Sequence, residues 1–404
     1  MASTVIVGSG IIGISTAYYL AQHQPGSTIH LVDSSAQLFA SASGYAGGFV
    51  ARDWFSPELE SLGALSFAEH EKLAEEYGGR EKWAYAKSLT VNYEPPRRTR
   101  RGADGEDWLL EGGSRADLVA ERSEVKDGNS PPWLRRFKGD GISVLDKGEG
   151  TAVLDPLKLC QFLIQKCKEA GVRIHHPAAI LNAGSDCHDE LSYVRIGYLD
   201  SSSESHIPAT RVLICAGCWT PEVLESMFPG SSIRIPVRAL AGHSLVVRNP
   251  EEVGEVYHSV YSRLDYFSPE IYARPNGDIW LGGLNSNIPL PPLATGAKPL
   301  DAPFKELKDA ARQLIKSDSE LEVVRAGLCF RPVTERGTPY ITRIQDEDLR
   351  QGYRTRKGPE GGVFVAAGHG PWGISLSLGT GKVMAELMQG RELSADIGAL
   401  GYLP

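Results

Sequence analysis

Three glycines and an aspartate near the start of the chain have the types and spacing to bind a dinucleotide. Gly8, Gly10 and Gly13 form a G-x-G-x-x-G pattern, and Asp33 lies 20 residues past Gly13. In this pattern the first glycine allows a tight turn, the second lets backbone approach a pyrophosphate, and the third lets a helix pack on a strand. Asp33 would accept hydrogen bonds from a ribose diol. The pattern indicates dinucleotide binding and leaves NAD and FAD both open.

The surrounding residues predict the elements that must hold this pattern. Residues 4–7 form a short β-branched run typical of a strand, residues 15–21 have a helical pattern, and residues 27–32 predict a second strand. Ile11 and Ile12 begin the helix, whose N-terminus would offer free N–H groups to phosphates. Ser34 follows the aspartate. A complete βαβ unit favours dinucleotide binding over an ordinary glycine turn before a helix.

A second strand, glycine turn and helix are predicted near the end of the chain. Residues 362–367 predict the strand, and the helix is predicted from Ile374 to Met388. Its N-terminus would stabilise the negative charge of a reduced isoalloxazine, which favours FAD, although a helix that merely packs through a tight glycine entry is the alternative. The residues predicted to contact the cofactor here are Gly370, Trp372, Gly373, Ile374 and Ser375.

Length and composition limit the class of protein. At 404 residues the chain is long enough for two domains, and its net charge of -8 argues against a nucleic-acid partner. The basic stretch at 97–101 is followed at once by acidic residues and is interpreted as a solvated loop. Six scattered cysteines and the lack of a long apolar run predict a cytoplasmic protein without a membrane span. No ligand spacing predicts a metal site. The expected partner is a small-molecule substrate.

Five blocks in the same order resemble the superfamily of D-amino-acid oxidase, glycine oxidase and sarcosine oxidase, which are FAD enzymes. The blocks are residues 8–13, 41–48, 212–219, 327–341 and 369–381. Residues 47–54 and 269–275 look closest to a fungal branch of FAD oxidoreductases. The resemblance implies an α/β fold, in which a Rossmann-type FAD-binding domain is interleaved with an α+β substrate domain built on an antiparallel sheet. The implied FAD-binding domain spans 1–85, 146–230 and 325–404, and the substrate domain spans 86–145 and 231–324.

The resemblance also implies further residues around FAD and above it. Residues 233–283 alternate apolar and polar types, as expected for an antiparallel sheet that roofs the flavin. Tyr261 and Tyr272 are candidate hydrogen-bond partners of the substrate, and Tyr266 falls in the same predicted sheet. The implied FAD contacts are Ser41, Ser43, Gly44, Ala46, Gly47, Gly48, Ala216, Gly217 and Trp219.

Arg331 and Arg52 are the candidate catalytic arginines. The block that contains Arg331 carries, in glycine and D-amino-acid oxidases, the arginine that clamps the substrate carboxylate, and a planar guanidinium suits that bidentate contact. The alternative is an ion pair between Arg331 and Glu335. Arg52 occupies the position of an active-site arginine of sarcosine oxidases, although its neighbours differ.

Two cysteine positions could carry chemistry. Cys329 aligns with the residue that attaches covalently to flavin in sarcosine oxidases, but the following Arg331-Pro332 is typical of non-covalent relatives. Non-covalent FAD is therefore expected, with attachment through Cys329 as the alternative. Cys215 and Cys218 have C-x-x-C spacing, and packing is favoured over a redox or metal role.

The favoured function is an FAD-dependent oxidation of a C–N bond in an amine or amino acid by hydride transfer to flavin N5. The chain has no lysine between Lys168 and Lys298, although sarcosine-type oxidases use one above the flavin to assist oxygen reduction. The electron acceptor could therefore be oxygen or another molecule. A flavin-binding regulatory or scaffold protein and an NAD-linked dehydrogenase are the alternatives.

Overall fold

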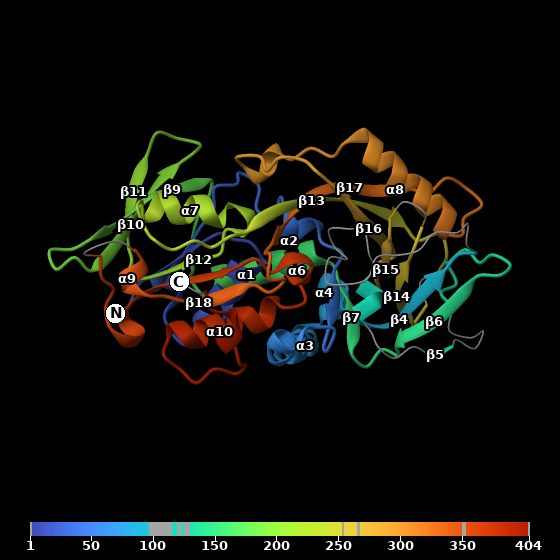
Figure 1. Ribbon diagram of the computed structural model, residues 1–404, viewed down its shortest axis with the longest axis horizontal. Coiled ribbons are helices and arrows are strands. Elements are labelled where there is room, and N and C mark those ends of the chain that lie inside the picture. Colours follow the sequence, from blue (N-terminus) through green and yellow to red (C-terminus); the bar gives the residue numbers. More distant parts are fainter. Residues whose placement is uncertain are drawn as a thin grey trace.

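Three β-sheets and the helices packed on them make up the computed structural model (Figure 1). The structure describes residues 2–96, 115–118, 123–124, 130–252, 254–264, 267–349 and 353–402. The basic stretch at 97–101 and Tyr266 lie outside the described residues. In the part of the chain that is described, no helix is long and apolar enough to cross a membrane.

The first sheet has six strands in the order β18-β19-β12-β1-β2-β8. All neighbours run parallel except β18, which is antiparallel to β19. The central strands are buried at every position, which explains their nearly continuous β-branched and apolar sequence. Helices α6 (Pro156–Glu169) and α10 (Ser377–Met388) each pack against α1 (Ile11–Leu20) on one face of this sheet. The strands are β1 (Thr4–Val7), β2 (Ile29–Val32), β8 (Arg173–His175), β12 (Arg211–Ile214), β18 (Tyr340–Ile344) and β19 (Gly362–Ala367).

A ten-stranded sheet forms the other half of the molecule and follows the order β17-β13-β16-β15-β14-β4-β6-β5, with β3 and β7 off this path. Its pairs are antiparallel except β14 with β4. The strands are β3 (Phe49–Ala51), β4 (Ala86–Glu94), β5 (Ser123–Glu124), β6 (Gly141–Asp146), β7 (Thr151–Val153), β13 (Arg238–Arg248), β14 (Tyr257–Ser262), β15 (Glu270–Ala273), β16 (Asp278–Ser286) and β17 (Val323–Val333).

The expected alternation of buried and exposed residues does not hold in this sheet. Every residue of β14 and β15 is buried, because both faces of these strands are covered. Val260 and Ile271 pack in one core with α8 (Asp301–Leu314), whereas Tyr261 and Tyr272 pack on the opposite face in a core shared with the first sheet. The antiparallel arrangement was predicted correctly, but the sheet is a shared wall between two cores.

A small three-stranded sheet, ordered β11-β10-β9, packs beside α7. Its strands are β9 (Ala178–Ser185), β10 (Leu191–Tyr198) and β11 (Glu204–Pro208). The α-helices are α1 (Ile11–Leu20), α2 (Ala42–Tyr45), α3 (Pro57–Tyr77), α4 (Gly79–Trp83), α6 (Pro156–Glu169), α7 (Thr220–Met227), α8 (Asp301–Leu314), α9 (Asp346–Leu349) and α10 (Ser377–Met388). Short 3-10 helices are η1 (Gly26–Thr28), η2 (Arg115–Leu118), η4 (Gly217–Trp219), η5 (Ala294–Gly296), η6 (Gly358–Glu360), η7 (Gly370–Trp372) and η8 (Gly398–Leu400).

Candidate functional site

A cavity of about 470 Å³ lies between the carboxyl ends of the parallel strands and the ten-stranded sheet. Crevices at this edge of a parallel sheet are the usual nucleotide sites of such folds. The predicted site residues that line it are Gly8, Gly10, Ile11, Ile12, Asp33, Ser34, Ser41, Ser43, Ala46, Gly47, Gly48, Ala216, Gly217, Trp219, Tyr272, Cys329, Arg331, Gly370, Gly373 and Ile374. The predicted site residues outside this lining are Gly13, Gly44, Arg52, Tyr261, Trp372 and Ser375.

The turn between β1 and α1 requires glycine at positions 8 and 13 of the pattern. Gly8 has φ +106°, and a Cβ there would lie 2.5 Å from the Cys215 carbonyl oxygen. A Cβ on Gly13 would lie 2.0 Å from the carbonyl oxygen of Gly8, so Gly13 does not line the cavity but shapes the turn. The Ser9 N–H donates to Asp33 Oδ2 at 2.8 Å. Asp33 therefore fixes the turn as well as lining the cavity, and burial raises its pKa.

Donors and acceptors without partners gather at this turn. The hydroxyl oxygens of Ser9 and Ser41 are buried and have no hydrogen-bond partner within the described residues. The first-turn amides of α1 at Ile12 and Gly13 lack intrahelical acceptors, as at any helix N-terminus. A diphosphate can accept hydrogen bonds from such donors, and the helix N-terminus also favours its negative charge. The residues present therefore fit the diphosphate of a dinucleotide.

The loop at 41–48 is held in place by two arginines, Arg274 directly after β15 and Arg325 in β17. Arg274 Nη2 donates to the Gly47 carbonyl oxygen at 2.7 Å, and Arg325 Nη1 donates to the Gly44 carbonyl oxygen at 2.9 Å. Arg274 is 2% exposed. Sequence reasoning missed both, since neither arginine belongs to a glycine motif. Their role is to connect the ten-stranded sheet to the cofactor-lining loop.

The C-terminal turn differs from the prediction. The helix was expected from Ile374, but α10 begins at Ser377, after η7 and a turn. The Ile374 carbonyl oxygen accepts from Nε2 of buried His70 at 2.9 Å, and the Ala51 N–H donates to the hydroxyl of Ser375. These contacts hold the residues outside the helix and turn Ser375 away from the cavity. Ile374 still lines the cavity, but the helix N-terminus lies three residues later.

Two buried histidines around this turn predict acid-sensitive stability. Burial lowers the pKa of His369 to about 3 and that of His70 to about 4. Below about pH 6.5 the unfolded chain binds protons at these histidines that the folded chain excludes. The free energy of unfolding is therefore highest above that pH and declines as the pH falls. Each histidine should lower the free energy of unfolding at pH 5 by about 2 kcal/mol relative to pH 7. Urea unfolding at the two pH values measures this loss.

The variant His369→Gln checks the assignment of this pH effect. Glutamine can still donate to Thr380, which now pairs with His369 Nε2 at 3.2 Å, but it does not titrate. We expect this variant to lose less stability between pH 7 and pH 5 than the wild type. His206→Gln, at an exposed position, is the matched control. An unchanged pH dependence in His369→Gln would contradict the prediction.

A buried ion pair forms part of the cavity wall and was not predicted. Nε and Nη2 of Arg115 donate to the two carboxylate oxygens of Glu270 at 2.9 and 3.1 Å, and both residues line the cavity. The Tyr272 hydroxyl donates to Glu270 at 2.7 Å, and Tyr261 lies behind it, 3.2 Å from the Tyr272 hydroxyl. Tyr261 therefore supports the wall without reaching the cavity. The Arg115 guanidinium stacks 4.6 Å from the ring centre of Trp372, which likewise stands behind the lining.

An aromatic stack roofs the cavity next to this ion pair. The ring centres of Tyr272 and Trp280 lie 5.2 Å apart with an interplanar angle of 5°, and Phe49 also stacks on Tyr272 at 5.5 Å. A Cβ on Gly47 would lie 2.5 Å from the Tyr272 ring. The glycine thus lets the cofactor-lining loop meet the aromatic wall.

The structure places the two candidate arginines differently. Arg331 lines the cavity, and its Nη1 donates to Asn285 Oδ1 at 2.7 Å. Glu335, which was its alternative partner, pairs instead with Arg238 at 3.5 Å. The side chain of Arg52 is 47% exposed and pairs with Asp53 at 3.1 Å. The structure therefore brings Arg331 to the cavity and leaves Arg52 outside it.

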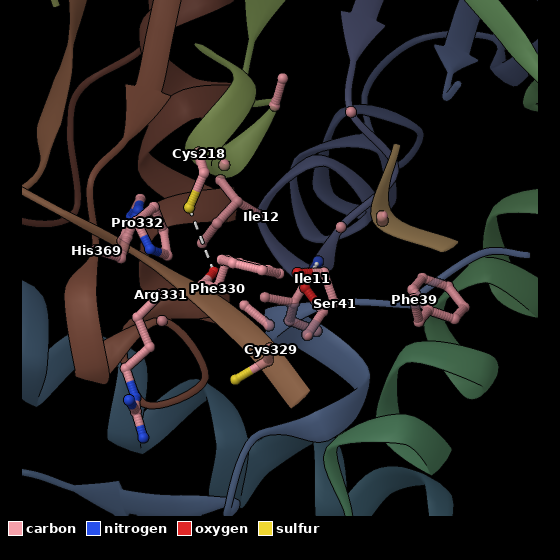
Figure 2. A pocket seen from close by; sticks show the side chains of 18 of the residues that line it. Ile11, Ile12, Phe39, Ser41, Cys218, Cys329, Phe330, Arg331, Pro332 and His369 are labelled. Carbon is pink, nitrogen blue, oxygen red and sulfur yellow. Dashed lines mark hydrogen bonds between the residues drawn. The ribbon is translucent and has the colours of Figure 1, made fainter. Parts of the chain in front are cut away.

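Cys329 and Arg331 point to the same side of β17, whereas Cys218 contacts the carbonyl oxygen of Phe330 on the other side (Figure 2). Cys215 and Cys218 are free, buried thiols whose Sγ atoms donate to backbone carbonyl oxygens at 3.3 Å. Burial raises the pKa of both thiols. These contacts favour a packing role for the C-x-x-C residues.

Acid precipitation tests whether Cys329 bonds covalently to a cofactor. Burial raises the pKa of the Cys329 thiol despite the nearby arginines, so the reactive thiolate is disfavoured. We expect trichloroacetic acid to leave all yellow colour in the supernatant and the polypeptide mass to equal that of the unmodified chain. Cys329→Ser should bind the flavin equally well. A polypeptide that gains the mass of one FAD, and loses it in Cys329→Ser, would show covalent attachment.

Comparisons with known proteins agree over nearly the whole chain. Residues 3–387 match the family model described as FAD dependent oxidoreductase. An oxidoreductase of Schizosaccharomyces pombe is 28% identical over 98% of this chain and 96% of its own length. Glycine oxidase of Bacillus subtilis is 23% identical over 97% of this chain and 94% of its own length. The crystal structure of glycine oxidase from Geobacillus kaustophilus shares the fold, with a TM-score of 0.73 and 20% identity over 99% of this chain and 98% of that one.

Proposed function

Because this chain belongs to the family of FAD-dependent oxidoreductases and FAD is its cofactor, we propose that it oxidises the C–N bond of a small amine or amino acid that carries a carboxylate. Bound FAD supplies the acceptor for the two electrons, which leave the substrate as a hydride from the carbon next to nitrogen. The nitrogen loses a proton to solvent, and water hydrolyses the resulting imine.

The Arg331 guanidinium carries the carboxylate part of the proposal. Within the described part of the chain it has no ion-pair partner, so its charge is available to an anion from the cavity. Asn285 holds one end of the guanidinium through Nη1, which leaves other N–H groups of the planar fork for a carboxylate. An anchor of this kind fixes the carbon that reacts relative to the cofactor.

The remaining wall would enclose the reacting part of the substrate. Tyr272 and Trp280 present aromatic surface that excludes water, and the Glu270 charge is compensated by Arg115. The diphosphate turn and the loop at 41–48 would hold the cofactor beside this wall. No protein base is required if the amine binds in its neutral form.

An anaerobic substrate screen tests the proposal. Purified protein loaded with FAD is mixed without oxygen with amino acids, N-methyl amino acids, polyamines and simple amines, and loss of the oxidised flavin absorbance is recorded. We expect bleaching by one or more carboxylate-bearing amines and not by the matched amines without a carboxylate. A protein that binds FAD and is bleached by none of them would instead favour a regulatory or scaffold role.

A further inference from the structure

Residues 287–300, which we call the strap, connect β16 to α8 and lie against the cavity without pairing to any described strand. Figure 1 shows this orange segment reaching back across the top of the view before α8. The strap contains four prolines, at positions 289, 291, 292 and 299. Each proline fixes its own φ, so the strap has few conformations to lose when it is held in one place.

Both ends of the strap are held by one buried histidine. His243 of β13 is 1% exposed, and its Nε2 accepts from the Leu300 N–H at 3.2 Å. Nε2 must then be unprotonated, so the proton lies on Nδ1, which donates to the Ser286 hydroxyl at 3.1 Å. Ser286 directly precedes the strap and Leu300 ends it. The two ends are therefore fastened to the same imidazole.

The middle of the strap is fastened to the Rossmann-type half of the molecule. The Trp219 Nε1–H donates to the Pro291 carbonyl oxygen at 2.9 Å. Ile288, Leu290 and Ala297 pack against a buried cluster that contains Cys218 and Phe330. The strap thus starts and ends on the ten-stranded sheet but is anchored midway beside β12.

The tip of the strap faces the cofactor site. Pro292, Leu293 and Ala294 line the same cavity as Gly217 and Trp219. These two residues lie at the carboxyl end of β12, next to the diphosphate turn, since a Cβ on Gly8 would be 3.0 Å from the Cα of Ala216. Leu293 is 37% exposed and lines the cavity, so its apolar side chain is accessible to a bound cofactor. An apolar tip in this position can cover a bound dinucleotide.

We propose that the strap covers bound FAD and limits its release, with Pro292–Ala294 as the cover and His243 as the residue that keeps the strap closed. FAD release then requires the tip to move away from the cavity. This movement is resisted by the contacts of the tip with FAD and by the fastenings at His243 and Trp219. The proposal concerns the cofactor alone and does not depend on the identity of the substrate.

Two substitutions at Leu300 and one at Leu293 separate the contribution of the cover from that of the hydrogen bond to His243. Leu293→Ala shortens the cover at an exposed position. Leu300→Ala is its matched control, because Leu300 belongs to the same strap, is 48% exposed and does not line the cavity. Leu300→Pro also loses the side chain but additionally removes the N–H that His243 accepts. The backbone of Leu300 has φ -91°, which proline can approach.

The rate of FAD release is measured on the holoprotein loaded with radiolabelled FAD. Excess unlabelled FAD is added, and the label retained with the protein on a filter is followed over time. We expect Leu293→Ala and Leu300→Pro to release label about 3- to 10-fold faster than the wild type, as expected for the loss of one apolar contact or one hydrogen bond. Leu300→Ala should release label within about twofold of the wild-type rate.

The proposal would be overturned if Leu293→Ala released label at the wild-type rate. It would also be overturned if Leu300→Ala accelerated the release as much as Leu293→Ala does. If Leu300→Pro lowers the thermal midpoint and cannot be used, the comparison of Leu293→Ala with Leu300→Ala decides the question. If Leu293→Ala changes only the concentration of amine that half-saturates flavin reduction, the strap covers the substrate path and the proposal is wrong. Because the release assay contains no amine, failure of the proposed oxidation would leave its result unaffected.

Discussion

Replacing Arg331 with methionine should lower kcat/KM for a carboxylate-bearing amine about 30-fold to several thousandfold, while FAD remains bound. The guanidinium lines the cavity, and its charge is not neutralised by any carboxylate of the described residues. Methionine has similar length but cannot donate a hydrogen bond. Removing one partner of a desolvated charge pair costs about 2 to 5 kcal/mol, which corresponds to this range of rates.

The effect is measured as the rate of anaerobic flavin reduction at several substrate concentrations. Arg238→Met is the matched control, because Arg238 lies on neighbouring β13 but pairs with Glu335 and does not line the cavity. The matched amine without a carboxylate should bleach the flavin of neither Arg331→Met nor the wild type. If Arg331→Met oxidised the carboxylate substrate at the wild-type rate, Arg331 would not be the anchor.

Local patterns predicted the parts of the fold that are determined by neighbouring residues. The glycine spacing and the run at 4–7 predicted β1, the turn and α1, because strand, turn and helix here involve fewer than twenty consecutive residues. Local signals also mark the start of α6, where Asp155 accepts from the Lys158 N–H and Pro156 occupies the first turn. The family resemblance then predicted the FAD cofactor and the general fold, which the comparisons confirm. The domain boundaries stay a prediction.

Side-chain partners distant in sequence could not be predicted. Arg115 and Glu270 are 155 residues apart, and no periodicity indicates that they meet. Asn285 positions Arg331 only because β16 and β17 both pair with β13. Arg52 was assigned by alignment, but the structure turns its side chain to solvent and Asp53. The start of α10 was misplaced because His70 and Ala51, both more than 300 residues earlier, capture the residues before it.

Replacing Gly13 with alanine should weaken FAD binding about 10²- to 10⁴-fold. A Cβ at Gly13 would lie 2.0 Å from the Gly8 carbonyl oxygen and 3.0 Å from Cys215 Sγ, so the turn must move by more than an ångström or the helix must separate from β1. Either movement displaces the Ile12 and Gly13 amides from the phosphates. Two hydrogen bonds to a charged acceptor contribute about 1.5 to 3 kcal/mol each, which gives the expected loss.

The dissociation constant is measured by titrating apoprotein with FAD and following flavin fluorescence. Gly254→Ala is the control, because a Cβ there meets no atom within 4 Å, and its affinity for FAD should equal that of the wild type. The apoprotein of Gly13→Ala should keep its secondary structure, since the clash is confined to one turn beneath a sheet whose central strands are buried. Wild-type affinity in Gly13→Ala would mean that the diphosphate is not bound at this turn. Loss of affinity in that variant alone would instead place the cofactor's phosphates at the N-terminus of α1, where the Ser9 and Ser41 hydroxyls have no other partner among the described residues.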